Sequence, residues 1–165
     1  MKIIVFSDSH NDIETMEKVS MAMKPDMILH LGDHCTDGIE LEQRIGNITV
    51  IVVKGNCDLW TAVSEERMLD LDGCRIFMTH GHEYGVRNGY STIIEEGRKR
   101  EAHIILCGHT HIPRIIKKSD ICLMNPGAVG EFARGPFKPS FGIINTDDMR
   151  RCSIEKVSAV IKDKK

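Results

Sequence analysis

The sequence has no hydrophobic run long enough to cross a membrane, and this absence sets the first limit on its function. A membrane-spanning helix needs about 18 or more consecutive apolar residues, and no stretch of the 165 residues approaches that length. The apolar run near the N-terminus is too short for a signal peptide and leads directly into polar residues. We therefore expect a cytoplasmic protein without a membrane partner.

Aromatic residues and excess charge are also scarce. The one Trp, two Tyr and five Phe are scattered along the chain, so no stretch is typical of a surface on which bases stack. The formal net charge is −2, which gives no general attraction to nucleic acid or to an anionic membrane. These features argue against nucleic acid as a partner.

The six cysteines lack the C-x-x-C spacing that is typical of redox and zinc motifs. An intracellular chain of this size does not need disulfides. Cys74, Cys107 and Cys122 lie in apolar runs and are predicted to be small core residues.

The length favours one domain, residues 1–165. In the first half, apolar runs predict strands over 3–6, 27–31 and 48–53. Amphipathic patterns predict helices over 12–23 and from 36 or 37 to 45. Such alternation predicts parallel strands joined by right-handed crossovers. Ligand sites form where the carboxyl ends of such strands meet.

The second half follows a different pattern. Asp72-Gly73 predicts a hairpin between strands 67–71 and 74–78, and a helix over 89–100 precedes a buried strand over 103–107. Four short strands, 114–116, 121–124, 141–144 and 152–157, are expected to be antiparallel. The whole pattern predicts an α/β fold with strands of both orientations.

Asp8 and His10 directly follow the first predicted strand. If the extended conformation continues, side chains two residues apart point the same way. The alternative is a helix start, because Asp8, Ser9, Asn11 and Asp12 are all types that cap helices. This stretch alone does not separate the two interpretations.

The same kind of polar ending recurs after other strands. Five predicted strand ends carry seven nitrogen or oxygen donors: Asp8, His10, Asp33, Asn56, His80, His109 and His111. Each donor alone has a simpler explanation, such as a turn or a hydrogen-bonded core histidine. Five coincident polar endings favour one shared cause, a metal site.

The order D-x-H, GD, GN, H, GHTH resembles the signature of calcineurin-like metallophosphoesterases. Within that family the chain resembles the small phosphodiesterases of the YfcE type, which are related to the retromer subunit Vps29. The resemblance extends from Asp8 to Asn125-Pro126-Gly127. It implies a four-layer α-β-β-α sandwich with two mixed sheets and a site at one edge of them.

The resemblance also implies two divalent ions. Asp8, His10 and His111 would hold one ion, Asn56, His80 and His109 the other, and Asp33 would bridge them. A donor set without thiolate suits Mn²⁺ best, with Fe, Ni, Co or catalytic Zn as alternatives. The expected reaction is hydrolysis of a phosphodiester by a metal-bridging hydroxide. Two divalent ions, two carboxylates and one hydroxide leave about one positive charge, which attracts a phosphate ester.

Cys57 departs from the wider family, in which larger relatives have histidine after GN. A thiol is a poor general acid, so poor leaving groups are expected to react slowly. Asp58 and His82 are further candidates for the substrate pocket, and Trp60 and Tyr84 could wall it. A Vps29-like interaction scaffold and a phosphomonoesterase or nucleotide phosphatase remain as alternative functions. A homodimer through an exposed strand edge also stays open.

Overall fold

The computed structural model describes residues 1–130, 137–146 and 151–161, which form two five-stranded sheets. The first sheet has the order β10 (Arg151–Lys156), β9 (Ser140–Asn145), β1 (Lys2–Phe6), β2 (Met27–His30), β3 (Thr49–Val52). The second has the order β4 (Glu66–Leu71), β5 (Cys74–Thr79), β6 (Ile104–Leu106), β8 (Cys122–Asn125), β7 (Arg114–Lys117). The helices are α1 (Ile13–Met23), α2 (Cys35–Ile45), α3 (Ser91–Lys99) and α4 (Val157–Val160), with 3-10 turns η1 (His82–Tyr84) and η2 (Val86–Asn88).

Both sheets are mixed. The predicted parallel order of β1, β2 and β3 is confirmed, and β9 and β10 add antiparallel strands at the other side. The β4–β5 hairpin is also confirmed. The expectation that β8 is antiparallel throughout is wrong, because β8 runs parallel to β6 and antiparallel only to β7. The chain leaves β6, forms β7 at the sheet edge and returns between the two.

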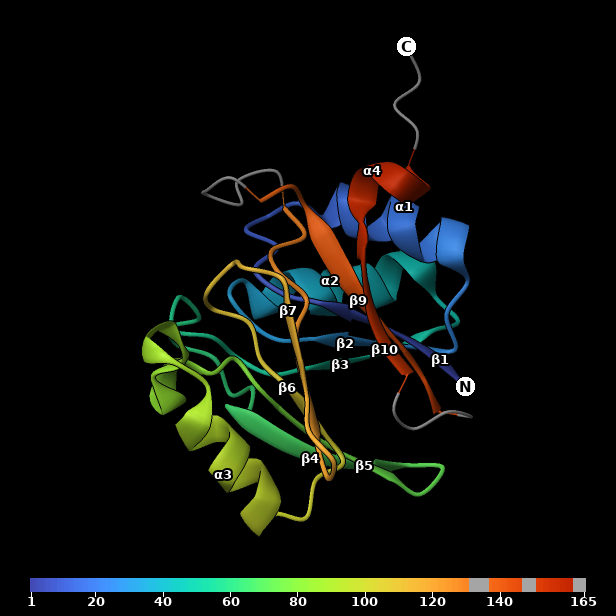
Figure 1. Ribbon diagram of the computed structural model, residues 1–165. Coiled ribbons are helices and arrows are strands. Elements are labelled where there is room, and N and C mark those ends of the chain that lie inside the picture. Colours follow the sequence, from blue (N-terminus) through green and yellow to red (C-terminus); the bar gives the residue numbers. More distant parts are fainter. Residues whose placement is uncertain (131–136, 147–150, 162–165) are drawn as a thin grey trace.

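The elements stack in four layers, as the family resemblance implied. Figure 1 shows α1 and α2 over the outer face of the first sheet and α3 on the outer face of the second. Ile3 and Val5 of β1 point into the core between the sheets, whereas Ile4 and Phe6 point towards the helices. Because both faces of β1 are covered, every position after Lys2 is apolar and buried.

All six cysteines are free thiols, and Cys74, Cys107 and Cys122 are buried as predicted. Among the described residues, no helix combines the length and the apolar character needed to span a bilayer.

Two glycines let the polar loops at the strand ends approach one another. Gly32, after β2, has a φ of +92°, and a Cβ there would lie 2.5 Å from the backbone nitrogen of Gly55 after β3. A Cβ on Gly108, after β6, would lie 1.9 Å from Ser7 Oγ after β1. Both contacts are closer than any side chain permits. Glycine at these positions therefore brings together strand ends within the first sheet and between the two sheets.

The segment after β1 does not continue as extended chain. Asp8, His10 and Asn11 have φ values of 54°, 45° and 71°, in the left-handed region. The Asp12 side chain then accepts a hydrogen bond from the Thr15 nitrogen (3.1 Å) and caps α1. The extended interpretation of Asp8 and His10 is therefore wrong, and the helix start is correct for Asp12. The loop positions both polar side chains before the helix begins.

A buried hydrogen-bond network holds this loop against α2. His30 Nδ1 accepts a hydrogen bond from the Gly32 nitrogen (3.3 Å), so the ring proton lies on Nε2 and is donated to Ser9 Oγ (3.0 Å). Ser9 Oγ donates to Asp37 Oδ2 (2.7 Å), which also accepts from the Asn11 nitrogen (2.8 Å). Because His30, Ser9 and Asp37 are almost fully buried, the network fixes the backbone around Ser9.

This network predicts acid sensitivity that originates at His30. Burial lowers the pKa of His30 to about 4 from an ordinary 6.5, so the unfolded chain binds the extra proton first as pH falls. The contribution of neutral His30 to the free energy of unfolding is therefore fully present above pH 6.5. It decreases by up to about 3 kcal/mol as the pH falls towards 4. In chemical denaturation at several pH values, His30→Gln should have the flatter profile over this window.

Ser20 provides the matched control for this measurement, because it is buried and its hydroxyl donates to the Met16 carbonyl (2.7 Å) without carrying a titratable group. Ser20→Ala should keep the shape of the pH profile of the unmodified protein. Parallel profiles for His30→Gln and the unmodified protein would contradict the assignment, whatever their difference in stability at neutral pH.

Candidate metal centre

The predicted donors converge where the carboxyl ends of the central strands of both sheets meet. Asp8, His10, Asp33 and His111 each place one ligand-type atom within 4.8 Å of the others. Asp33, His80 and His109 do the same in a second group. Asp33 therefore belongs to both groups.

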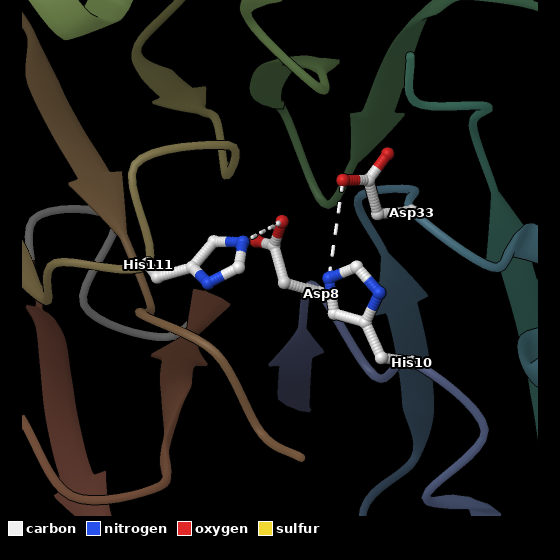
Figure 2. A group of neighbouring side chains, drawn as sticks. All are labelled: Asp8, His10, Asp33 and His111. Atoms are coloured by element: carbon white, nitrogen blue, oxygen red, sulfur yellow. Dashed lines mark ion pairs between the residues drawn. The ribbon is translucent and has the colours of Figure 1, made fainter. Parts of the chain in front are cut away.

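The first group is formed by three loops. Asp8 and His10 follow β1, Asp33 follows β2, and His111 follows β6. His111 Nε2 lies 3.1 Å from Asp8 Oδ1, and His10 Nε2 lies 4.0 Å from Asp33 Oδ2. Figure 2 shows the two imidazoles facing these two carboxylates. The arrangement presents two oxygen donors and two nitrogen donors to one small volume.

The second group lies around the fully buried His80, which follows β5. Its Nδ1 donates to the Leu31 carbonyl (2.8 Å), so Nε2 is directed to Asp33 Oδ1 at 3.4 Å and to His109 Nδ1 at 3.2 Å. A backbone carbonyl that fixes the tautomer and orientation of an imidazole is typical of metal-binding histidines.

Both carboxylates are held by hydrogen bonds from neighbouring loops. Asp8 Oδ2 accepts from Ser7 Oγ (2.6 Å) and from the His109 nitrogen (3.2 Å). Asp33 Oδ1 accepts from the Cys57 nitrogen (3.0 Å). These contacts fix the orientation of each carboxylate while its second oxygen stays available to a ligand.

Backbone strain is concentrated in these loops. Five of the seven predicted donors have left-handed φ values: Asp8, His10, Asp33, His109 and His111. This conformation is uncommon for residues other than glycine and costs about 1–3 kcal/mol when strained. Such residues are typically found at sites that bind or react, where the surrounding structure keeps them in place.

The electrostatics of the site follow from its two buried carboxylates. Burial acts to raise the pKa of Asp8, but His111 and His80 hold it below its usual range. Burial acts to raise the pKa of Asp33 as well, but His80 and the Cys57 N–H hold that pKa well below its usual range. In return, Asp8 raises the pKa of His111, and the carboxylates outweigh burial to raise that of His80. A cation would therefore compete with protons for these histidines.

Two buried atoms that lack hydrogen bonds test whether a metal fits. Asp8 Oδ1 and His10 Nε2 are buried and have no hydrogen-bond partner in the described part of the chain. Such atoms are costly in a folded protein unless a ligand satisfies them. A divalent ion suits both, because carboxylate oxygen and imidazole nitrogen are common ligands of such ions.

Asn56, Cys57 and Asp58 lie together in the loop after β3. Asn56 lines a hollow of about 520 Å³ together with Asp33 and His111, and its Nδ2 lies 3.5 Å from Cys57 Sγ. Partial burial and the charge of Asp33 raise the pKa of the Cys57 thiol to about 11, so the thiol is neutral near pH 7. Asp58 stabilises the loop, since its carboxylate accepts from the nitrogens of Cys35 (2.8 Å) and Gly55 (2.7 Å).

His82 lies beside the second group but outside the hollow. Its ring centroid is 5.5 Å from that of His80 and 6.1 Å from that of His109, and its Nε2 lies 3.2 Å from Glu83. Trp60 is fully exposed. Tyr84 hydrogen-bonds Glu66 and packs edge-on against a core phenylalanine, so it does not wall the pocket.

The sequence interpretation missed two features of the site. One is the His30–Ser9–Asp37 network, whose members are separated by 21 and 28 residues and share no local motif. The other is Arg87, which lines the same hollow as His10, Asp33 and His111. An exposed arginine inside a short 3-10 turn carries no signal in periodicity or spacing.

Comparisons with known proteins identify the family of the chain. Residues 1–149 match the model of the calcineurin-like phosphoesterase superfamily domain. The phosphodiesterase YfcE of Escherichia coli K12 is 25% identical over an alignment that covers 89% of this chain and 89% of YfcE. A Streptococcus pneumoniae structure described as a predicted phosphoesterase is 30% identical, with a TM-score of 0.69 over 87% of this chain and 83% of that one.

The fold also occurs in a protein that is named for vacuolar sorting. Vps29 of Entamoeba histolytica, solved in complex with Zn²⁺, is 19% identical and has a TM-score of 0.69 over 95% of this chain and 99% of Vps29. At this identity the likeness concerns the fold alone. The family match covers the strands and loops that carry the candidate metal centre, and the named relatives are consistent with a metal-dependent phosphoesterase. The chain therefore belongs to the calcineurin-like phosphoesterase superfamily.

Proposed function

We propose that this chain is a phosphodiesterase that depends on two divalent metal ions. The observation that carries the proposal is the pair of donor groups that share Asp33. A carboxylate common to two groups suits a pair of ions about 3.5–4 Å apart, the spacing of two-metal phosphatases. Family membership over residues 1–149 supports the reaction class. We further propose that residues 1–165 act as one metallophosphoesterase domain.

The donors divide between the two ions as the family resemblance implied. Asp8, His10 and His111 would hold one ion, Asn56, His80 and His109 the other, and Asp33 would bind both. The neutral amide of Asn56 could complete the second group, because Asn56 and Asp33 line the same hollow. Mn²⁺ is the preferred ion, with Fe, Ni, Co and Zn as alternatives, because the donors are oxygen and imidazole without thiolate.

The ions and the protein would contribute different parts of the catalysis. When bound, the ions would acidify a water molecule and neutralise charge on the phosphate oxygens. The protein orients the donors: Ser7 and the His109 nitrogen hold Asp8, and the Leu31 carbonyl holds His80. Preoriented groups lower the barrier because they need no reorganisation during the reaction.

Cys57 sets the expected range of leaving groups. It occupies the position after Asn56 at which larger relatives carry histidine, and its thiol is neutral near pH 7. A neutral, weakly acidic thiol donates a proton poorly to a departing alkoxide. Aryl leaving groups, which depart without a proton, should therefore react best.

The interaction scaffold is the second candidate function, because the Vps29 structure shares the fold. All seven donor types expected of the metal centre are nevertheless present in this chain. A phosphomonoesterase on the same metal core also remains a candidate. The cytoplasmic location and the homodimer stay predictions from sequence.

Removal of the shared carboxylate tests the metal centre. Asp33→Asn should lower bound Mn²⁺ and reduce hydrolysis of bis(4-nitrophenyl) phosphate by at least about 100-fold, since loss of only an outer-shell partner costs 10–100-fold. Bound metal is measured by mass spectrometry after chelation and reloading, and hydrolysis by nitrophenolate release. Asp120→Asn, at an exposed carboxylate paired with Arg98, is the control and should retain both properties. Absence of turnover with Mn²⁺, Ni²⁺, Co²⁺ and Zn²⁺ alike would favour the scaffold.

The role of Cys57 is tested with leaving groups of different basicity. Cys57→His should raise hydrolysis of an alkyl 4-nitrobenzyl phosphodiester by at least about tenfold relative to the aryl diester, because an imidazolium can protonate the alkoxide. Cys57→Ser changes the side chain without adding an effective acid and should give no relative gain. Equal responses of the two variants would show that the proton donor lies elsewhere.

A further inference from the structure

The hollow above the metal centre continues into a larger groove. This groove has a volume of about 710 Å³ and is bordered by η2, by the loop after β6 and by the first residue of β7. Arg87 and His111 line both the hollow and the groove, so the two spaces adjoin. The groove, called the η2 groove below, is within the range of about 300–1,000 Å³ that is typical of small-molecule sites. It is much larger than one phosphate group requires.

The fixed charge of the η2 groove is positive. Arg87 and Arg114 line it, and none of its lining residues is a carboxylate. Neither arginine has a hydrogen-bond or ion-pair partner among residues 1–130, 137–146 and 151–161. Two unpaired guanidinium groups beside a metal centre attract anions, and the planar guanidinium binds phosphate or carboxylate through two parallel hydrogen bonds.

Other arginines of the chain show that this lack of partners is unusual. Four arginines outside the groove form ion pairs with nearby carboxylates: Arg44, Arg75, Arg98 and Arg100. A fifth, Arg67, donates a hydrogen bond to the Val52 carbonyl. The groove arginines therefore differ from these five arginines, whose guanidinium groups are already engaged.

Apolar side chains line the rest of the groove. Val86 is buried, Tyr90 is partly buried, and Ile112 leaves 42% of its surface exposed. An exposed isoleucine and a tyrosine that line the same groove provide a surface for a sugar, a base or another organic group. The combination of apolar surface and a few placed charges is typical of sites for amphipathic small molecules.

We propose that the η2 groove binds a second anionic group of the substrate, carried on the organic substituent of the phosphate ester. This inference rests on the proposed phosphodiesterase function and narrows its substrate class. The scissile phosphate would lie at the metal centre, and the organic substituent would lie against Tyr90 and Ile112. The second phosphate or carboxylate would be bound by Arg114 and Arg87.

The positions of the two arginines indicate which anionic group of the substrate each of them would contact. Arg87 lines both spaces and could contact either anionic group, whereas Arg114 lines only the groove. Arg114 should therefore act on the second anionic group alone. Its substitution is the sharper test, and substitution of Arg87 should affect all anionic substrates to some degree.

A matched pair of nucleotide esters tests the groove with the Mn²⁺-loaded protein. Thymidine 5′-(4-nitrophenyl phosphate) and its 3′-phosphorylated form share the scissile bond and the leaving group and differ by one phosphate. The unmodified protein should prefer the 3′-phosphorylated ester in kcat/KM by about tenfold or more, the size expected for one charge-assisted contact. Arg114→Gln should remove most of this preference, and Arg98→Gln, at an arginine outside the groove, should retain it.

Calorimetry separates failure of the groove from failure of the proposed reaction. Thymidine 3′,5′-bisphosphate should bind about tenfold or more tightly than thymidine 5′-monophosphate, and Arg87→Gln/Arg114→Gln should lose this ratio. If neither ester is hydrolysed but the ratio is present and lost in the double variant, the proposed reaction fails and the groove stands. Equal affinity for the two nucleotides, or a ratio that survives in the double variant, would overturn the proposal.

Discussion

The burial of two carboxylates next to each other is the constraint on which the rest of the structure depends. Asp8 and Asp33 are at most 3% exposed, and their oxygens belong to a group that spans no more than 4.8 Å. Buried charges are tolerated only when they are paired, hydrogen-bonded or bound to a metal. The loops around them supply imidazoles, hydroxyls and backbone N–H groups. The glycines at 32 and 108 allow these loops to come close enough to do so.

The charges of the centre and of the η2 groove complement each other. The carboxylates create a negative electrostatic potential that attracts cations. Divalent ions bound there would make the potential positive, so that it attracts an incoming phosphate. Arg87 and Arg114 keep a positive potential along the adjoining groove without any ion. A substrate with two separated anionic groups meets a favourable potential at both places. A phosphate ester whose organic substituent is uncharged meets only one of them.

Much of the fold could be predicted because it depends on local patterns. The run from Ile3 to Phe6 is apolar because helices and the second sheet cover both faces of β1, and the alternation of elements gives its parallel neighbours. The order of polar strand ends was enough to locate the donors. The orientation of β8 was not predictable from its four residues. The chain first forms β7 at the sheet edge, and β8 then returns between β7 and β6, so β8 pairs with one antiparallel and one parallel neighbour.

The conformation of the site was less predictable than its composition. The left-handed backbone at Asp8 and His10 is imposed by contacts with α2 and with the loop after β6, which no short stretch contains. Arg87 and Arg114 were missed for a related reason. An exposed charge on a turn or at the start of an edge strand is common in proteins, and its role becomes apparent only from the groove and the neighbours around it.

The cost of the site is also an argument about function. Five donors with left-handed backbone, and buried atoms of Asp8 and His10 without hydrogen-bond partners, reduce the stability of the folded chain. A scaffold that binds its partner elsewhere gains nothing from such features, because mutations that relieved them would stabilise the protein without loss. A centre that holds divalent ions gains from both, because the ions would satisfy these buried atoms. The strain and the buried atoms without hydrogen bonds therefore favour a working metal centre over a scaffold that makes no use of the site.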